Sequence, residues 1–163
     1  MSLELGGKSP NIVCKDADVE ACIPGVAGAI FFNQGQCCCA GSRLFVEKSI
    51  FDKVVEGVAA DARKIKVGPG MDPATQMGPL VSDEQQLRVL GYLEAGFSEG
   101  AKAVVGGRKL GNKGYFVEPT VLVEVLPMAN ASIYRIATEL RAARCGSHCC
   151  KIFGATPLMS VDS

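Results

Sequence analysis

Apolar and polar positions alternate along the chain with two periods, one typical of strands and one typical of helices. Short apolar runs at residues 2–5 and 11–14, separated by a glycine pair, predict two strands joined by a turn. The small and apolar residues of 19–32 predict a deeply buried helix. Asp16 or Asp18 is placed to cap its N-terminus. The first part of the chain is therefore expected to be strand, turn, strand and helix.

The middle of the chain repeats a strand followed by a helix. Residues 43–47 (RLFVE) predict a strand, and Ser49 is placed to cap an amphipathic helix after it. The apolar positions of that helix recur at helical spacing and are Phe51, Val54, Val55, Val58 and Ala59. An irregular loop over 67–82 then leads to a helix over 84–96, capped by Ser82. We expect this helix to turn three leucines inward, namely Leu87, Leu90 and Leu93.

Extended segments return after that helix. Residues 102–105 predict a strand, and 115–125 predict an extended pair broken at Pro119. Strands that alternate with helices indicate an α/β fold, with a mainly parallel twisted sheet flanked by helices. After Met128 the composition changes, and the alanine-rich run over 129–144 predicts a helix.

Composition and charge narrow the possible partners. The 163 residues are 48% hydrophobic and 21% charged, a balance typical of a compact globular domain. Seventeen basic and seventeen acidic residues cancel and are interspersed, so we expect no nucleic-acid partner and no attraction to a membrane surface. No run of eighteen apolar residues and no secretory signal pattern occurs, which favours a cytoplasmic protein.

Eight cysteines stand out, three of them consecutive at Cys37, Cys38 and Cys39. Without a secretory signal they are better interpreted as free thiols than as disulfides. Adjacent residues are expected to converge poorly on a tetrahedral metal, whose paired ligands are usually separated by two to four residues, so we predict no metal there. A second group at 145–150 (CGSHCC) holds ligand types that zinc accepts, but in crowded spacing.

The segment FFNQGQCCCAGSR at 31–43 places these thiols between a glycine-broken helix end and a strand, where nucleophiles are often found. A thiolate attacks carbonyl carbon well, although most buried cysteines serve only as small apolar residues. Hydrolysis of a resulting thioester would need a base, and the single histidine, His148, lies in the atypical tail. Glu4, between two leucines, is the carboxylate for which burial would raise the pKa most usefully, unless it faces solvent from an edge strand.

Two segments resemble the active-site motifs of the aldehyde dehydrogenase superfamily: LELGGKSP at 3–10 matches its glutamate motif, and FFNQGQCCCAGS at 31–42 its cysteine motif. They occur in the order of the family, with Cys38 following Glu4 by 34 positions. Further likeness at 67–82, 100–107 and 114–122 extends the resemblance over about residues 2–127.

The resemblance implies roles for particular residues. In the G-Q-x-C pattern Cys38 is the nucleophile, and Cys37 and Cys39 line the site. Cys38 would attack an aldehyde, the oxyanion being held partly by its own backbone N–H, and Glu4 would activate the water that hydrolyses the thioester after hydride transfer to NAD or NADP. The backbone at Leu5 and Gly6 would lie near the nicotinamide. The full-length parent is expected to be a homo-oligomer.

Two departures from the family shape the expected activity. Residues 1–127 would be a catalytic-domain fragment without the family's cofactor-phosphate domain, and no nucleotide-binding glycine motif occurs in the chain. Residues 128–163 form an atypical tail that a reading-frame shift would explain, with Lys151 where the family has an acid. We therefore expect the isolated chain to be inactive. The alternatives are a noncatalytic thiol-rich binding or structural domain, and a hydrolase that uses Cys38 and Glu4 without a cofactor.

Overall fold

A computed structural model describes residues 2, 5–125 and 139–145 of the chain, the last of these ranges as backbone only. Its strands are β1 (Pro10–Val13), β2 (Arg43–Glu47), β3 (Lys102–Val105), β4 (Thr120–Val123) and β5 (Glu139–Cys145). Its helices are α1 (Val19–Phe31), α2 (Phe51–Lys64) and α3 (Asp83–Ser98), and a short 3-10 turn, η1, covers Phe32–Gly35.

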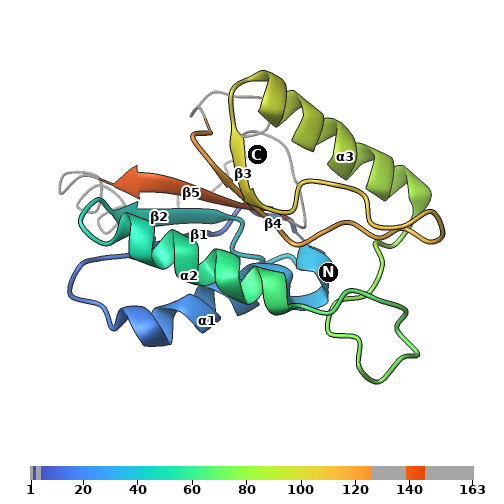
Figure 1. The fold of residues 1–163 in the computed structure, drawn as a ribbon, viewed down its shortest axis with the longest axis horizontal. Helices are drawn as coiled ribbons and strands as arrows, with labels where there is room; N and C mark the ends of the chain where they lie inside the picture. The colour runs from blue at the N-terminus through green and yellow to red at the C-terminus, as the bar shows by residue number, and fades with distance from the viewer. Residues whose placement is uncertain (1, 3–4, 126–138, 146–163) are drawn as a thin grey trace.

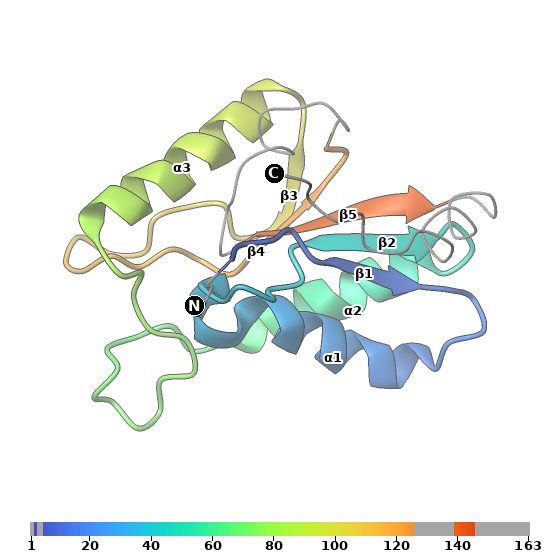
Figure 2. The same cartoon turned by 180° about the vertical axis from the view of Figure 1, so that it is seen from behind.

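The strands form one sheet in the order β1-β2-β5-β4-β3. β1 pairs with β2, β2 with β5 and β4 with β5 in parallel, while β3 pairs antiparallel with β4. Figures 1 and 2 both show α1 and α2 side by side on one face of the sheet and α3 on the other. The predicted α/β fold, a mainly parallel twisted sheet flanked by helices, is confirmed.

The alternation of side chains along β4 explains how one sheet has two apolar faces. Val121 packs in the larger core with α1 and α2, while its neighbour Leu122 packs with Val89 and Leu93 of α3. Successive strand residues point to opposite faces, so the consecutive apolar residues 121–123 of β4 serve both faces of the sheet. β2 is instead buried mainly through Leu44 and Val46.

Local signals define several helix ends. The carboxylate of Asp18 accepts hydrogen bonds from the backbone of Glu20 and Ala21, and the hydroxyl of Ser82 accepts one from Gln85, so both predicted caps are confirmed. The cap predicted at Ser49 is wrong. α2 begins one residue later, after Ile50, and has no side-chain cap.

The inward face predicted for α3 is partly wrong. Leu93 is buried and Leu90 packs against the core, but Leu87 is 62% exposed. The helix instead buries Gln86, whose amide donates to the backbone oxygen of Phe116, and Val89. The inward face of α3 therefore includes Gln86 and Val89 as well as Leu90 and Leu93, and the glutamine can be buried there because it is hydrogen-bonded.

The other strand expectations have mixed outcomes. The predicted strands at 43–47 and 102–105 have the observed bounds, and the strand predicted at 11–14 begins one residue earlier, at Pro10. The strand predicted at 2–5 is not seen at Ser2 or Leu5, and Leu3 and Glu4 lie outside the described residues.

The helix predicted at 129–144 is contradicted where the structure describes it. Residues 139–145 form β5, which lies between β2 and β4. Backbone pairing on both sides outweighs the weak local preference of alanine for helices. The boundary predicted at residue 127 between a catalytic-domain fragment and an atypical tail stays a prediction, although β5 lies beyond it and completes the sheet.

Gly106, which follows β3, offers a test of this packing. Its φ is +72°, and a Cβ atom there would collide with the carbonyl oxygen of Pro119. We expect Gly106→Ala to lower the free energy of unfolding by at least about 2 kcal/mol, since a left-handed backbone and a steric collision act together.

Gly25 in α1 is the matched control, because a Cβ there would meet nothing within 4 Å. Gly25→Ala is expected to stabilise the chain by about 0.5–1 kcal/mol. Urea denaturation of both variants checks this pair, and an equal loss of stability in the two would contradict the packing described.

Candidate active site

The candidate site begins where α1 ends. Three successive residues adopt left-handed backbone angles, with φ of 48° at Asn33, 57° at Gln34 and 68° at Gly35. Such angles cost a non-glycine residue roughly 1–2 kcal/mol each, and asparagine tolerates them better than most. They redirect the chain out of the helix, so that the cysteines do not continue it.

Hydrogen bonds hold the segment that follows. The Asn33 side chain donates to the backbone oxygen of Gln36 at 3.2 Å, and the Gln36 side-chain oxygen accepts from the backbone N–H of Val81 at 3.1 Å. The N–H of Gly41 donates to the oxygen of Ala29 in α1 at 2.9 Å. These hydrogen bonds therefore hold the backbone on both sides of the three cysteines. Sequence reasoning missed the roles of Asn33 and Gln36, although both Asn and Gly at a helix end are signals for left-handed backbone, and Asn33 and Gly35 follow α1 closely.

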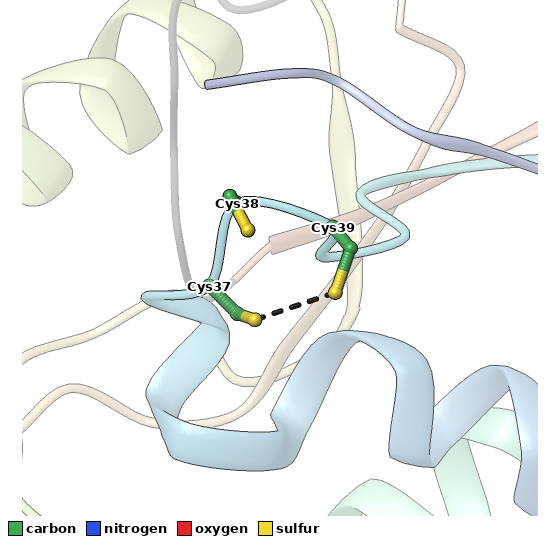
Figure 3. Close-up of side chains that lie close together, drawn as sticks. All are labelled: Cys37, Cys38 and Cys39. Carbon is green, nitrogen blue, oxygen red and sulfur yellow. Dashed lines mark hydrogen bonds between the residues drawn. The ribbon is translucent and has the colours of Figure 1, made fainter. Parts of the chain in front are cut away.

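Residues 37–40 form a tight turn, here called the cysteine turn, in which the N–H of Ala40 donates to the oxygen of Cys37 at 3.1 Å. Cys37 is half-buried, and Cys38 and Cys39 are exposed. The sulfurs of Cys37 and Cys39 lie 3.4 Å apart, and all three sulfurs lie within 4.8 Å of one another (Figure 3). The expectation that adjacent cysteines converge poorly is wrong, because a turn, unlike a strand, places successive side chains on one side.

The cysteine turn also alters two of its thiols. Hydrogen bonding from the backbone of Cys39, and then from its side chain, lowers the pKa of Cys37. The pKa of Cys39 is raised, first by its hydrogen bond to Cys37 and then by the negative charge of its two neighbours. Of these two thiols, Cys37 therefore loses its proton at a lower pH than Cys39 does.

The Gly6-Gly7 pair lies beside the cysteine turn. A Cβ atom at Gly7 would lie 3.4 Å from the carbonyl oxygen of Cys38, and Arg43 donates to the backbone oxygen of Lys8 at 2.7 Å. Leu5 and Gly6, the predicted cofactor contacts, are exposed just before this point. The structure thus brings the glycine pair and Cys38, which are far apart in the sequence, close together in space.

Glu4, the predicted base, lies outside the described residues, as do His148 and the cysteine group at 145–150 apart from the backbone of Cys145.

The opposite pKa shifts of Cys37 and Cys39 predict that the two thiols are alkylated with different pH dependence. Because only the thiolate reacts, Cys37 should reach half of its maximal rate with iodoacetamide at a lower pH than Cys39 does. Mass-spectrometric mapping of modified peptides across a pH series measures both rates. Identical pH profiles for the two residues would contradict the hydrogen-bond arrangement in the turn.

No helix in the part of the chain that the structure describes combines the length and apolar character needed to cross a membrane.

Comparisons with known proteins agree with one another. A family model described as "Aldehyde dehydrogenase family" matches residues 1–134. The mitochondrial aldehyde dehydrogenase of Leishmania tarentolae is 50% identical over 125 residues, which cover 77% of this chain and 25% of that protein. This chain spans about a quarter of the length of the curated relatives it matches.

Solved structures of similar proteins match in fold as well as in sequence. An NAD+ complex of aldehyde dehydrogenase from Bacillus cereus aligns with a TM-score of 0.86 and 44% identity, covering 88% of this chain and 30% of that one. Betaine aldehyde dehydrogenase from Staphylococcus aureus, in complex with NAD+, aligns with a TM-score of 0.84 and 34% identity, covering the same shares. The chain belongs to the aldehyde dehydrogenase family.

Proposed function

We propose that this chain carries the reacting cysteine and the base of an enzyme that oxidises an aldehyde to a carboxylic acid with NAD or NADP. The single observation that carries the proposal is the placement of Gly7 against the carbonyl oxygen of Cys38. This contact supports one site made from the glutamate motif and the cysteine motif, whose proposed reacting residues Glu4 and Cys38 are 34 positions apart in the sequence.

Cys38 is the proposed nucleophile. It is exposed on a turn that hydrogen bonds fix at both ends, so that its sulfur is open to a carbonyl carbon. Attack by the thiolate forms a carbon–sulfur bond and leaves a negative charge on the former carbonyl oxygen, which the backbone N–H of Cys38 would help to hold. The pKa of the neighbouring Cys39 is raised, first by its hydrogen bond to Cys37, so that this exposed thiol is a poor nucleophile near neutral pH.

Glu4 is the proposed base of the second half of the reaction. Once the carbon attached to sulfur has lost its hydride, the thioester must be hydrolysed to release the acid. A carboxylate two residues before Gly6 would remove a proton from the attacking water. Its place in the motif next to the glycine pair supports this role.

The region around Leu5 and Gly6 fits a nicotinamide ring. Both residues are exposed, and Gly6 has no side chain to keep a flat ring from the backbone. NAD or NADP would supply the hydride acceptor, and the two solved relatives from Bacillus cereus and Staphylococcus aureus are complexes with NAD+.

We also propose the substrate class, the oligomeric state and the partners of the parent protein. The substrate would be a small-molecule aldehyde, and the parent protein would be a homo-oligomer without nucleic-acid or membrane partners. A cytoplasmic location stays a prediction, because the Leishmania relative is named as mitochondrial.

A chimera tests the proposed function directly. Residues 2–125 would replace the matching segment of the Bacillus cereus enzyme, whose fold they share at a TM-score of 0.86. We expect the chimera to produce NADH when it is given an aldehyde. A chimera that folds and binds NAD+ but forms no NADH would overturn the proposal.

The isolated 163-residue chain is expected to behave differently. It has no nucleotide-phosphate glycine motif, so we predict no detectable NADH formation from aldehyde and NAD+ by the purified chain. The absorbance of NADH under saturating substrate measures this. Turnover equal to that of the chimera would show that the cofactor is held in another way.

A further inference from the structure

The cysteine turn holds a group of sulfur atoms that the proposed reaction does not need. Attack on an aldehyde uses one thiol, yet the sulfurs of Cys37, Cys38 and Cys39 all lie within 4.8 Å of one another. Figure 3 shows the side chains of Cys37 and Cys39 directed toward each other, with that of Cys38 above the same space. No carboxylate or imidazole belongs to this group in the part of the chain that the structure describes.

The spacing of the sulfurs is close to that of a metal site. At a metal–sulfur distance of about 2.3 Å, three sulfurs arranged in a triangle around one ion lie about 4 Å apart. The sulfurs of Cys37 and Cys39 are 3.4 Å apart and no two of the three sulfurs are more than 4.8 Å apart, so the spacing that a metal needs lies between these two values. The spacing of the three sulfurs is therefore compatible with bonds from all of them to one ion.

We infer that the cysteine turn is a binding site for one thiophilic metal ion, of the class of Cd2+, Zn2+ and Cu+, held by the sulfurs of Cys37, Cys38 and Cys39. Three sulfur ligands without oxygen favour soft or borderline ions over Mg2+ or Ca2+. The expectation of no metal rested on the poor convergence of adjacent cysteines, and the turn removes that reason.

The protonation of the cluster determines what binding releases. Metal coordination requires thiolates, whereas an ordinary free thiol is mostly protonated near neutral pH. A cation among the three sulfurs favours their deprotonated forms, because it attracts the negative charge of each thiolate. Binding near neutral pH should therefore release protons into solution.

Occupation of the site would also remove the nucleophile. A sulfur that donates its electron pair to a metal is not available to attack a carbonyl carbon. This inhibition rests on the proposed function of Cys38, whereas metal binding itself does not.

Cd2+ is the probe we choose, because it is redox-inert and its bonds to thiolate absorb in the ultraviolet. The experiment uses the full chain with Cys145, Cys149 and Cys150 changed to serine, which removes the second group of cysteines and leaves Cys14 and Cys22 as the thiols outside the turn. We expect one Cd2+ per chain, sulfur-to-metal absorption and release of protons. Binding should disappear in the triple variant C37S/C38S/C39S, and each single variant should bind at least about tenfold more weakly, since even outer partners of a metal site are worth that much.

Two control experiments show whether binding is specific to the folded cysteine turn. Cys22→Ser, which removes a half-buried thiol in α1, should leave affinity and stoichiometry unchanged. The chain unfolded in urea should bind at least about tenfold more weakly, because the turn and not the bare sequence positions the sulfurs. Undiminished binding in the triple variant, equal loss in Cys22→Ser, or equal affinity in urea would overturn the inference. Far-ultraviolet circular dichroism confirms that each variant is folded in buffer.

Discussion

Cys38→Ser is expected to lower NADH formation by the chimera at least about 1,000-fold, because at neutral pH a serine hydroxyl supplies almost no anion where a thiol supplies a few per cent. Cys38 is exposed on the cysteine turn, so serine should occupy its place without disturbing the core. The loss should appear in kcat with little change in the affinity for NAD+. Initial rates at saturating aldehyde measure it.

Two other cysteines serve as controls for that result. Cys39→Ser removes a neighbouring exposed thiol, and Cys22→Ser removes one in α1. Both variants should keep at least about a third of the activity, because neither sulfur bonds to the substrate. A loss of activity in Cys39→Ser as large as that in Cys38→Ser would contradict the assignment of Cys38 as the nucleophile.

Glu4→Gln is expected to separate the two halves of the reaction. Cys38 should still be acylated, so that one NADH per site forms in a rapid burst. The thioester should then persist, because the amide of glutamine cannot take a proton from water. Removal of a general base typically costs 10²–10⁴-fold, and we expect the steady rate to fall by about 100-fold or more.

Stopped-flow measurement of NADH distinguishes burst from steady rate in that variant. Glu20→Gln is the matched control. Glu20 lies exposed in the first turn of α1, where it pairs with Lys53 at 2.8 Å, and its loss should leave both phases unchanged. Disappearance of the burst in Glu4→Gln would mean that Glu4 acts before hydride transfer, and an unchanged steady rate would exclude it as the base.

Features set by neighbouring residues were predictable from the sequence. The strand at 43–47 and the caps at Asp18 and Ser82 each depend on a few consecutive side chains, and the structure has all three. The cap expected at Ser49 failed within the same local range, because the helix starts one residue later than the pattern indicated.

Features set by distant partners were not predictable in this way. The alanine-rich residues 139–145 form β5 because β2 and β4 bind it on both sides, and no local preference contains that information. Leu87 is exposed although it lies on the leucine row of α3. Its neighbour Gln86 is buried instead, with its side-chain amide donating a hydrogen bond to the backbone oxygen of Phe116. Both outcomes come from contacts between segments far apart in the chain.

The candidate site likewise has features that the sequence predicted and features that it did not. The motif resemblance gave Cys38 and Glu4 their roles, but nothing in the spacing of three adjacent cysteines predicted that their sulfurs would gather. That arrangement requires the turn closed by Ala40 and the left-handed backbone from Asn33 to Gly35. The order of the residues was visible in the sequence, and their placement in space was not.

Limited alkylation of the purified chain tests the central claim, that Cys38 is the reactive thiol, most directly. The chain is treated at neutral pH with less iodoacetamide than protein and then digested with trypsin, which releases residues 16–43 with Cys22 and all three cysteines of the turn in one peptide. Alkylation is irreversible, so fragmentation of that peptide reports where the reagent first reacted. We predict that Cys38 carries most of the label; equal labelling of Cys37, Cys38 and Cys39, or no labelling of any of them, would contradict the account.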